Sequence, residues 1–129
     1  MSFIGENTGQ RLSMIQGIDL KATGPTTLFT VPSGKKCLVE DVVLEVTAAA
    51  TVTVVAVIRI GKASAYTEWL AATTLTGLDT VGEVMSLART ANLLVHQTFN
   101  SGDTIKLDVT VGATATSLTV SAHVFGYTY

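Results

Sequence analysis

The sequence is poor in charged residues: Lys, Arg, Asp and Glu make up only 14% of 129 residues, and the formal net charge is −2. Nucleic-acid binding requires a basic patch or stripe, so this balance argues against a nucleic-acid partner. Aromatic residues account for only 6% of the chain. The length is that of one domain, which is large enough to bury a core without disulfides or a metal ion.

Cysteine is limited to Cys37, so no disulfide can form within the chain. A single thiol is typical of a protein that folds in a reducing cytosol, or of a particle assembled there. Cys37 alternates with Val39 in a predicted strand, and this pattern favours a small buried hydrophobic residue over a reactive thiol.

Long apolar runs are also missing. The most apolar stretch, residues 52–60, is interrupted by Thr53 and Arg59 and is far shorter than the roughly 20 residues that span a bilayer. Residues 1–10 have neither a basic start nor an apolar run, so they do not form a signal peptide. We therefore expect a soluble protein with no membrane partner.

No nucleotide-binding or nucleophile motif is present. Gly34 and Lys35 resemble the end of a phosphate-binding loop, but Phe29 stands where its first glycine belongs and Lys36 where its Ser or Thr belongs. No serine lies in a Gly-x-Ser-x-Gly elbow. The sequence therefore predicts no catalytic residue and no small-molecule substrate.

Metal-binding patterns are equally sparse. His96 and His123 are isolated on different predicted strands, and no zinc-site or EF-hand spacing occurs. Sheet topology could still bring the two histidines together with a carboxylate, as in cupin-type enzymes. We rank a cupin-like metal enzyme as a distant third function and predict no metal and no cofactor.

The residues that are abundant favour β-structure. The chain contains 21 Thr, 16 Val and 14 Ala, and β-branched residues suit pleated strands. Residues 103–129 show strict alternation, with Ala122 and Val124 on one face of a strand and His123 on the other. The many threonines give an outer sheet face that is polar without being charged. Such a face suits contact with another protein, although simple solvent exposure is at least as common.

The strand signals predict an all-β fold: an antiparallel two-sheet sandwich of jelly-roll type with about eight strands. Two hairpins are expected, one joining residues 36–47 to 51–60 and one within residues 103–129. Residues 82–91 fit either a strand or one helical turn, and residues 93–97 fit a strand.

Residues 1–14 show neither helical nor strand periodicity, and they predict a flexible or extended N-terminal arm before a sandwich domain at 15–129. Fully extended, this arm could reach about 40 Å, which is enough to contact a neighbouring subunit. A frayed terminus is an equally good interpretation. The candidate partner-binding residues of the arm are Phe3, Ile4, Asn7, Arg11 and Leu12.

Two aromatic residues offer a different function. Trp69 and the nearby Tyr66 could form a platform on which a sugar stacks. Single aromatics more often anchor a core or an interface, so we favour packing.

Three segments resemble small virion proteins of tailed bacteriophages. Residues 26–47 (TTLFTVPSGKKCLVEDVVLEVT) resemble a recurring unit of strand, tight turn and long strand. Residues 51–61 (TVTVVAVIRIG) resemble the strand that follows, and residues 99–127 (FNSGDTIKLDVTVGATATSLTVSAHVFGY) resemble a closing hairpin. Together the segments cover about half of the chain.

The resemblance implies a non-enzymatic capsid decoration (cement) protein, or a minor head or tail component. Such a protein would bind the major capsid protein on the outside of the phage head, would often be a homotrimer, and would be assembled in the host cytoplasm. A tail, receptor-binding or carbohydrate-binding β-sandwich module is the alternative. The resemblance supplies no catalytic residue.

Overall fold

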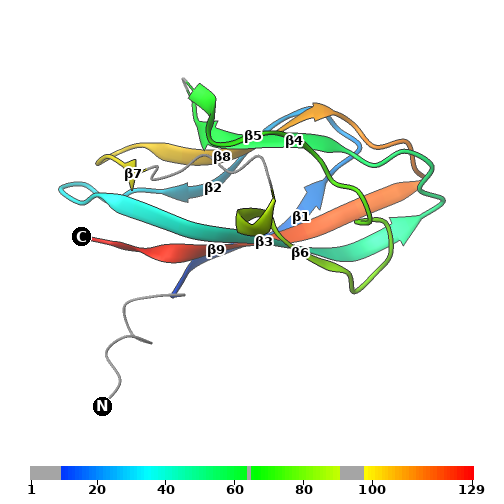
Figure 1. Cartoon of the computed structure of the whole chain (residues 1–129), viewed down its shortest axis with the longest axis horizontal. Helices are drawn as coiled ribbons and strands as arrows, with labels where there is room; N and C mark the ends of the chain where they lie inside the picture. The colour runs from blue at the N-terminus through cyan, green and yellow to red at the C-terminus, as the bar shows by residue number, and fades with distance from the viewer. Residues whose placement is uncertain (1–9, 64, 91–97) are drawn as a thin grey trace, which may run out of the picture.

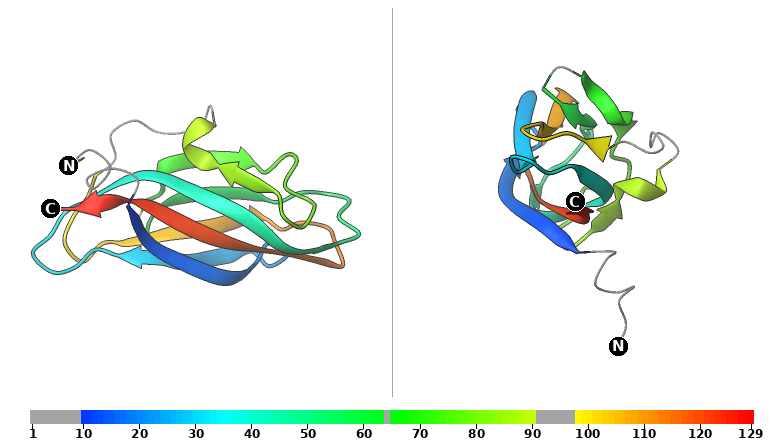
Figure 2. Two further views of the ribbon diagram at one scale, coloured as in Figure 1. Left: turned by 90° about the horizontal axis from the view of Figure 1, so that it is seen from below. Right: turned by 90° about the vertical axis from the view of Figure 1, so that its left-hand side faces the viewer.

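The alternating segments of the sequence fold into strands that stack in two layers. The computed structural model describes residues 10–63, 65–90 and 98–129. Across these ranges, two antiparallel sheets face each other over one hydrophobic core (Figure 1). In the view along the long axis, strands of both sheets surround that core (Figure 2). The predicted antiparallel two-sheet sandwich is confirmed.

The two sheets contain nine strands in the described residues, against about eight predicted. Sheet A has the order β1-β9-β3-β6, and β7 also pairs with β3. Its strands are β1 (Arg11–Asp19), β3 (Cys37–Ala50), β6 (Val84–Ser86), β7 (Thr98–Phe99) and β9 (Ser117–Thr128). Sheet B has the order β2-β8-β4-β5. Its strands are β2 (Gly24–Thr30), β4 (Val57–Lys62), β5 (Ala65–Thr74) and β8 (Thr104–Val111).

The strand pairs are nested along the chain. β1 pairs with β9, β2 with β8, β3 with β6, and β4 with β5, all antiparallel. This is the pattern produced when one long hairpin rolls up and places successive strand pairs in opposite sheets. It defines a jelly roll, as the sequence predicted.

Both predicted hairpins are wrong. β3 and β4 lie in different sheets, and so do β8 and β9. β9 instead pairs with β3 over almost its full length, from Cys37 opposite Thr128 to Ala50 opposite Ser117. Period-2 alternation identifies a strand and its buried face, but it carries no information about which strand lies next to it.

The predicted arm is four residues too long. β1 begins at Arg11, which pairs with Phe125, so residues 11–14 belong to sheet A. The backbone carbonyl of Gln10 also accepts a hydrogen bond of 2.9 Å from the Gly126 N–H. The first nine residues of the predicted arm lie outside the described residues.

The middle of the chain was predicted as a strand or a helical turn at residues 82–91, and it forms both. β6 is followed directly by a 3₁₀ turn, η1 (Leu87–Arg89). The Asp41 carboxylate holds this junction, because it accepts hydrogen bonds from the Ser86 hydroxyl at 2.6 Å and from the Ala88 N–H at 3.0 Å. The predicted strand at 93–97 lies outside the described residues.

Trp69 joins the two sheets through the core. It is only 2% exposed, and its indole N–H donates a 3.0 Å hydrogen bond to the Val39 carbonyl of the opposite sheet. Both Trp69 and Leu70 are buried, which breaks the expected alternation. A bulge explains this, because residues 66–69 of β5 lie opposite the single residue Gly61 of β4.

At one edge of the sandwich, the strands of the two sheets are also tied together. The Ser13 hydroxyl of β1 donates a 2.7 Å hydrogen bond to the Leu28 carbonyl of β2. This bond uses a backbone acceptor on an edge strand, and unpaired edge groups otherwise promote unwanted strand pairing.

Replacing Gly61 with alanine should destabilise the fold. A Cβ at this position would overlap the backbone of Ala65, Tyr66 and Glu68, and backbone cannot move aside as a flexible side chain can. We expect Gly61→Ala to lower the free energy of unfolding by about 2 kcal/mol or more, measured by urea denaturation. Thr67→Ala, at an exposed position of the same bulge, is the control and should change it by less than about 1 kcal/mol. Equal stability of the two variants would contradict the bulge geometry.

Candidate docking surface

The outer face of sheet A is the candidate functional site. Strand β9 shows which side chains belong to this face. Val120, Ala122 and Val124 point into the core, so the residues that alternate with them point outward. The antiparallel register then adds the outward residues of the neighbouring strands. We define the sheet A face by Arg11, Met14, Leu38, Asp41, Val43, Glu45, His123, Phe125 and Tyr127.

Most side chains of the sheet A face are apolar or aromatic. None of its members belongs to the buried core or is among the partly buried residues packed against that core. Met14 is 38% exposed, and Val84, on the adjacent β6, is 62% exposed. The other apolar and aromatic members, Leu38, Val43, Phe125 and Tyr127, are partly buried. The face is therefore a partly exposed apolar surface, and such surfaces are common at sites of protein contact.

His123 lies at the centre of this face. It pairs with Met14 of β1 on one side and with Val43 of β3 on the other. Its Nε2 is 3.5 Å from Oε1 of Glu45, and the two side chains are 18% and 47% exposed. The imidazole is therefore mostly covered by its neighbours, whereas the carboxylate remains accessible.

The outer face of sheet B is different, because several of its charges are paired with one another. Arg59 forms a 2.7 Å salt bridge with Asp108, and its guanidinium lies 5.1 Å from the centre of the Tyr66 ring. Lys62 lies 3.6 Å from Glu68. Charges that are already compensated offer little to a protein partner, since separating them costs free energy.

The predicted contact residues are distributed unevenly. Arg11 is exposed on the sheet A face, whereas Leu12 is partly buried and packs against the core. Phe3, Ile4 and Asn7 lie outside the described residues. Reasoning from the sequence missed the remainder of the face, because its members come from three strands whose register was unknown.

The favoured interpretation of Trp69 as a packing residue is confirmed, because its ring is enclosed in the core. The alternative sugar platform does not form around it. Tyr66 is only partly buried and carries Arg59 against its ring. The two rings therefore present no joint surface for a sugar.

The described residues contain no group of three or more His, Cys, Asp or Glu side chains that could hold a metal ion. His123 has one acidic neighbour, Glu45, and His96 lies outside the described ranges. Gly34, from the Gly-Lys pair, lies in the turn between β2 and β3, and its N–H donates to the Ser101 hydroxyl at 2.9 Å. The chain enters a strand after this turn, whereas a phosphate-binding loop would open a helix. In the described part of the chain, no helix has the length and apolar character to cross a membrane.

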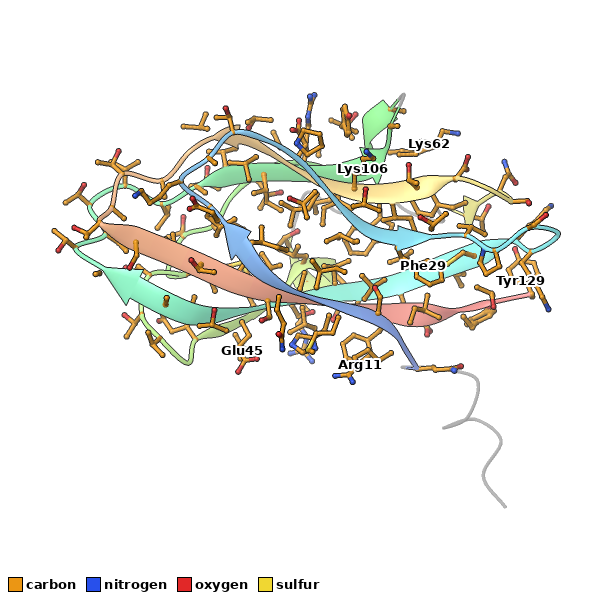
Figure 3. All side chains as sticks on the ribbon, turned by 180° about the vertical axis from the view of Figure 1, so that it is seen from behind. Arg11, Phe29, Glu45, Lys62, Lys106 and Tyr129 are labelled. Carbon is orange, nitrogen blue, oxygen red and sulfur yellow. The ribbon has the colours of Figure 1, made fainter. Side chains whose placement is uncertain are left out.

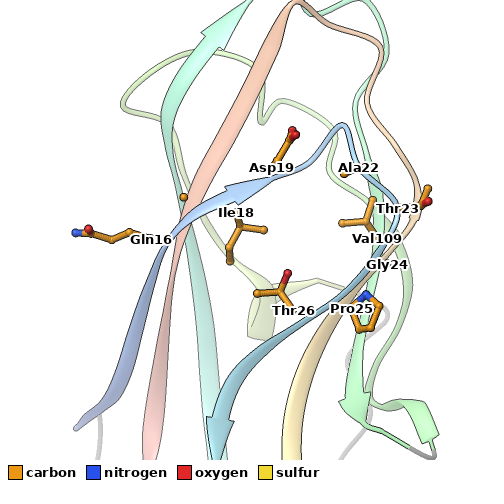
Figure 4. Close-up of a pocket in the computed structure, with 10 residues that line it drawn as sticks. Gln16, Ile18, Asp19, Ala22, Thr23, Gly24, Pro25, Thr26 and Val109 are labelled. Carbon is orange, nitrogen blue, oxygen red and sulfur yellow. The ribbon is translucent and has the colours of Figure 1, made fainter.

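A pocket of about 370 Å³ lies at the bend between β1 and β2. In Figure 4, Ile18 and Thr26 point into the space between these strands, while Gln16 and Asp19 point away from it. The Asp19 carboxylate accepts a 2.9 Å hydrogen bond from the Lys21 N–H, so it shapes the bend. Asp19 is the acidic residue of the lining, and it points away from the pocket. The lining therefore does not form a cluster of polar groups suited to catalysis.

No model of a known protein family matches the sequence, and no curated protein matches it. Among solved structures, a chain of the cyanophage Pam1 capsid asymmetric unit is similar, with a TM-score of 0.54 and 20% sequence identity. The similarity covers 93% of this chain and 86% of that chain. A chain of the acidic stable capsid structure of Helicobacter pylori bacteriophage KHP30 is similar with a TM-score of 0.55 and 14% identity, over 92% of both chains. At these identities the similarity establishes a shared fold.

Cys37 should be protected from thiol reagents in the native protein. It is fully buried in the core, and desolvation raises the pKa of its thiol from 9.0 to about 11. At neutral pH, we expect Ellman's reagent to label the native protein far more slowly than the urea-unfolded protein. Equal labelling rates would contradict the buried position.

The same pKa shift links the stability of the fold to pH. The folded state holds the proton more tightly, so this contribution to stability is complete below pH 9.0 and is lost as the pH rises toward about 11. Urea unfolding should therefore show a steeper alkaline loss of stability for the wild type than for Cys37→Ala.

Proposed function

We propose that this protein is a non-enzymatic virion component of a tailed bacteriophage that binds the outside of the capsid lattice and stabilises it. In this role it is a decoration (cement) protein whose partner is the major capsid protein, and it acts as a trimer. The observation that carries the proposal is the nearly end-to-end similarity in fold to chains of two phage capsid structures. The sequence resemblance to phage virion proteins points the same way.

The architecture suits this role physically. A cement protein must bridge subunits through surface area, and it therefore needs a rigid body with an adhesive face. The two sheets are held together by a continuous core, by the Trp69–Val39 hydrogen bond and by the Ser13–Leu28 hydrogen bond. Specific stable interfaces bury about 800 Å² per partner, which a domain of this size can supply.

The first nine residues are the proposed lattice-binding arm, with Phe3, Ile4 and Asn7 as its contact residues. They precede Gln10, which is fixed to β9 by the hydrogen bond from Gly126. A segment that starts from such an anchored point can add a strand to the sheet edge of a neighbouring subunit.

Deleting residues 1–9 should weaken binding to phage particles without unfolding the domain. The deletion ends before β1, whereas removal of 1–14 would also take four residues from sheet A. We expect co-sedimentation with capsids that lack this protein to fall at least about tenfold, while the thermal midpoint changes by only a few degrees. Lys106→Glu, on the opposite side of the sandwich, is the control and should bind as the wild type does. Full binding by the deletion variant would reject the arm as the contact.

A tail or receptor-binding module that recognises carbohydrate is the second candidate, and the exposed part of Tyr66 favours it. On this alternative, a glycan array should show a specific ligand, and Tyr66→Ala should abolish its binding. Trp69→Ala is unsuitable here, because it would remove a core side chain. Specific glycan binding without capsid binding would replace the cement role with this one.

A further inference from the structure

We propose that the sheet A face packs against the same face of a second copy of this chain, across a two-fold axis that runs parallel to the sheet. A two-fold contact of this type is isologous, so the patch must be complementary to itself. The inference does not depend on binding to a capsid.

The strand register gives the sheet A face this self-complementarity. Arg11 lies beside Phe125 on one side of β9, and Glu45 lies beside Ser121 on the other side. Phe125 and Ser121 are each two residues from His123, in opposite directions along β9. Arg11 and Glu45 are therefore placed symmetrically about His123.

The two symmetric positions carry opposite charges. The two copies meet face to face with the axis over His123 and at right angles to the line from Arg11 to Glu45. Arg11 of each copy then lies over Glu45 of the other. The same operation brings Phe125 of each copy toward Val43 of the other, so that an aromatic side chain meets an aliphatic one. Two salt bridges then flank a centre where the two His123 side chains meet, with Met14, Val43 and Phe125 of each copy around them. A centre poor in charge between charged flanks is common in protein interfaces.

Both charged side chains are available for this contact. Arg11 is exposed and makes no ion pair with any other described residue. Glu45 contacts His123 through Oε1 and keeps 47% of its side chain exposed. In Figure 3 both project from the same side of the sandwich, opposite Lys62 and Lys106.

The area of the face is adequate. Strands lie about 4.8 Å apart and rise about 3.3 Å per residue. Three strands over the nine-residue length of β1, together with the three residues of β6, therefore present roughly 500 Å² in projection. The accessible area is larger because side chains roughen the surface. It approaches the ~800 Å² per partner of a standard interface, at the small end of that class.

Charge reversal tests the contact in solution, by sedimentation of the full chain over a wide concentration series. Wild type should double the mass of its smallest unit as the concentration rises, whether that unit is a monomer or the proposed trimer. Arg11→Glu and Glu45→Arg should each weaken doubling at least about tenfold, because the axis applies each change twice. The double variant Arg11→Glu/Glu45→Arg should return to within a few-fold of the wild type.

Lys106→Glu is the matched control, since it reverses a charge on the outer face of sheet B and should leave doubling unchanged. Circular dichroism melts check that every variant is folded. The proposal is overturned if the mass of the wild type never doubles or if the single charge reversals leave doubling unchanged. It is also overturned if the double variant does not regain doubling. Because no capsid is used, these outcomes are separate from a failure of the proposed lattice binding.

Discussion

The pairing of β9 with both β1 and β3 is the constraint on which the rest of the structure depends. Antiparallel register fixes which side chains of the three strands share a face. Val120, Ala122 and Val124 then complete the core, while His123 and Phe125 project outward beside Met14 and Val43. A slip of one residue would exchange the two faces, so the core and the candidate docking surface are specified together.

The two outer faces of the sandwich differ in their charges and in their apolar side chains. On sheet B, Arg59 and Asp108 neutralise each other and Thr residues complete a polar surface. On sheet A, apolar side chains surround one histidine, and Arg11 and Glu45 are left accessible at two symmetric positions.

A departure from regular alternation marks the position where a side chain of one sheet is hydrogen-bonded to the backbone of the other. The bulge over Gly61 turns Trp69 inward, and its indole N–H then satisfies the Val39 carbonyl across the core. The sequence favoured packing for Trp69, and its core position confirms this. The bulge itself was not predicted, because an irregularity in the opposing register cannot be read from one strand alone. The early start of β1 was missed for a related reason. Its pairing with β9, rather than its own periodicity, makes residues 11–14 a strand.

The sequence alone determined the all-β class, the buried thiol of Cys37 and the inward face of β9. These properties are local, since they depend on β-branched composition and on alternation within single segments. Tertiary structure alone decided that β3 and β4, and likewise β8 and β9, part into opposite sheets. It also decided that Arg11, His123 and Glu45 share one surface. Partner choice and register depend on contacts between residues distant in the chain, and one-dimensional periodicity does not record them.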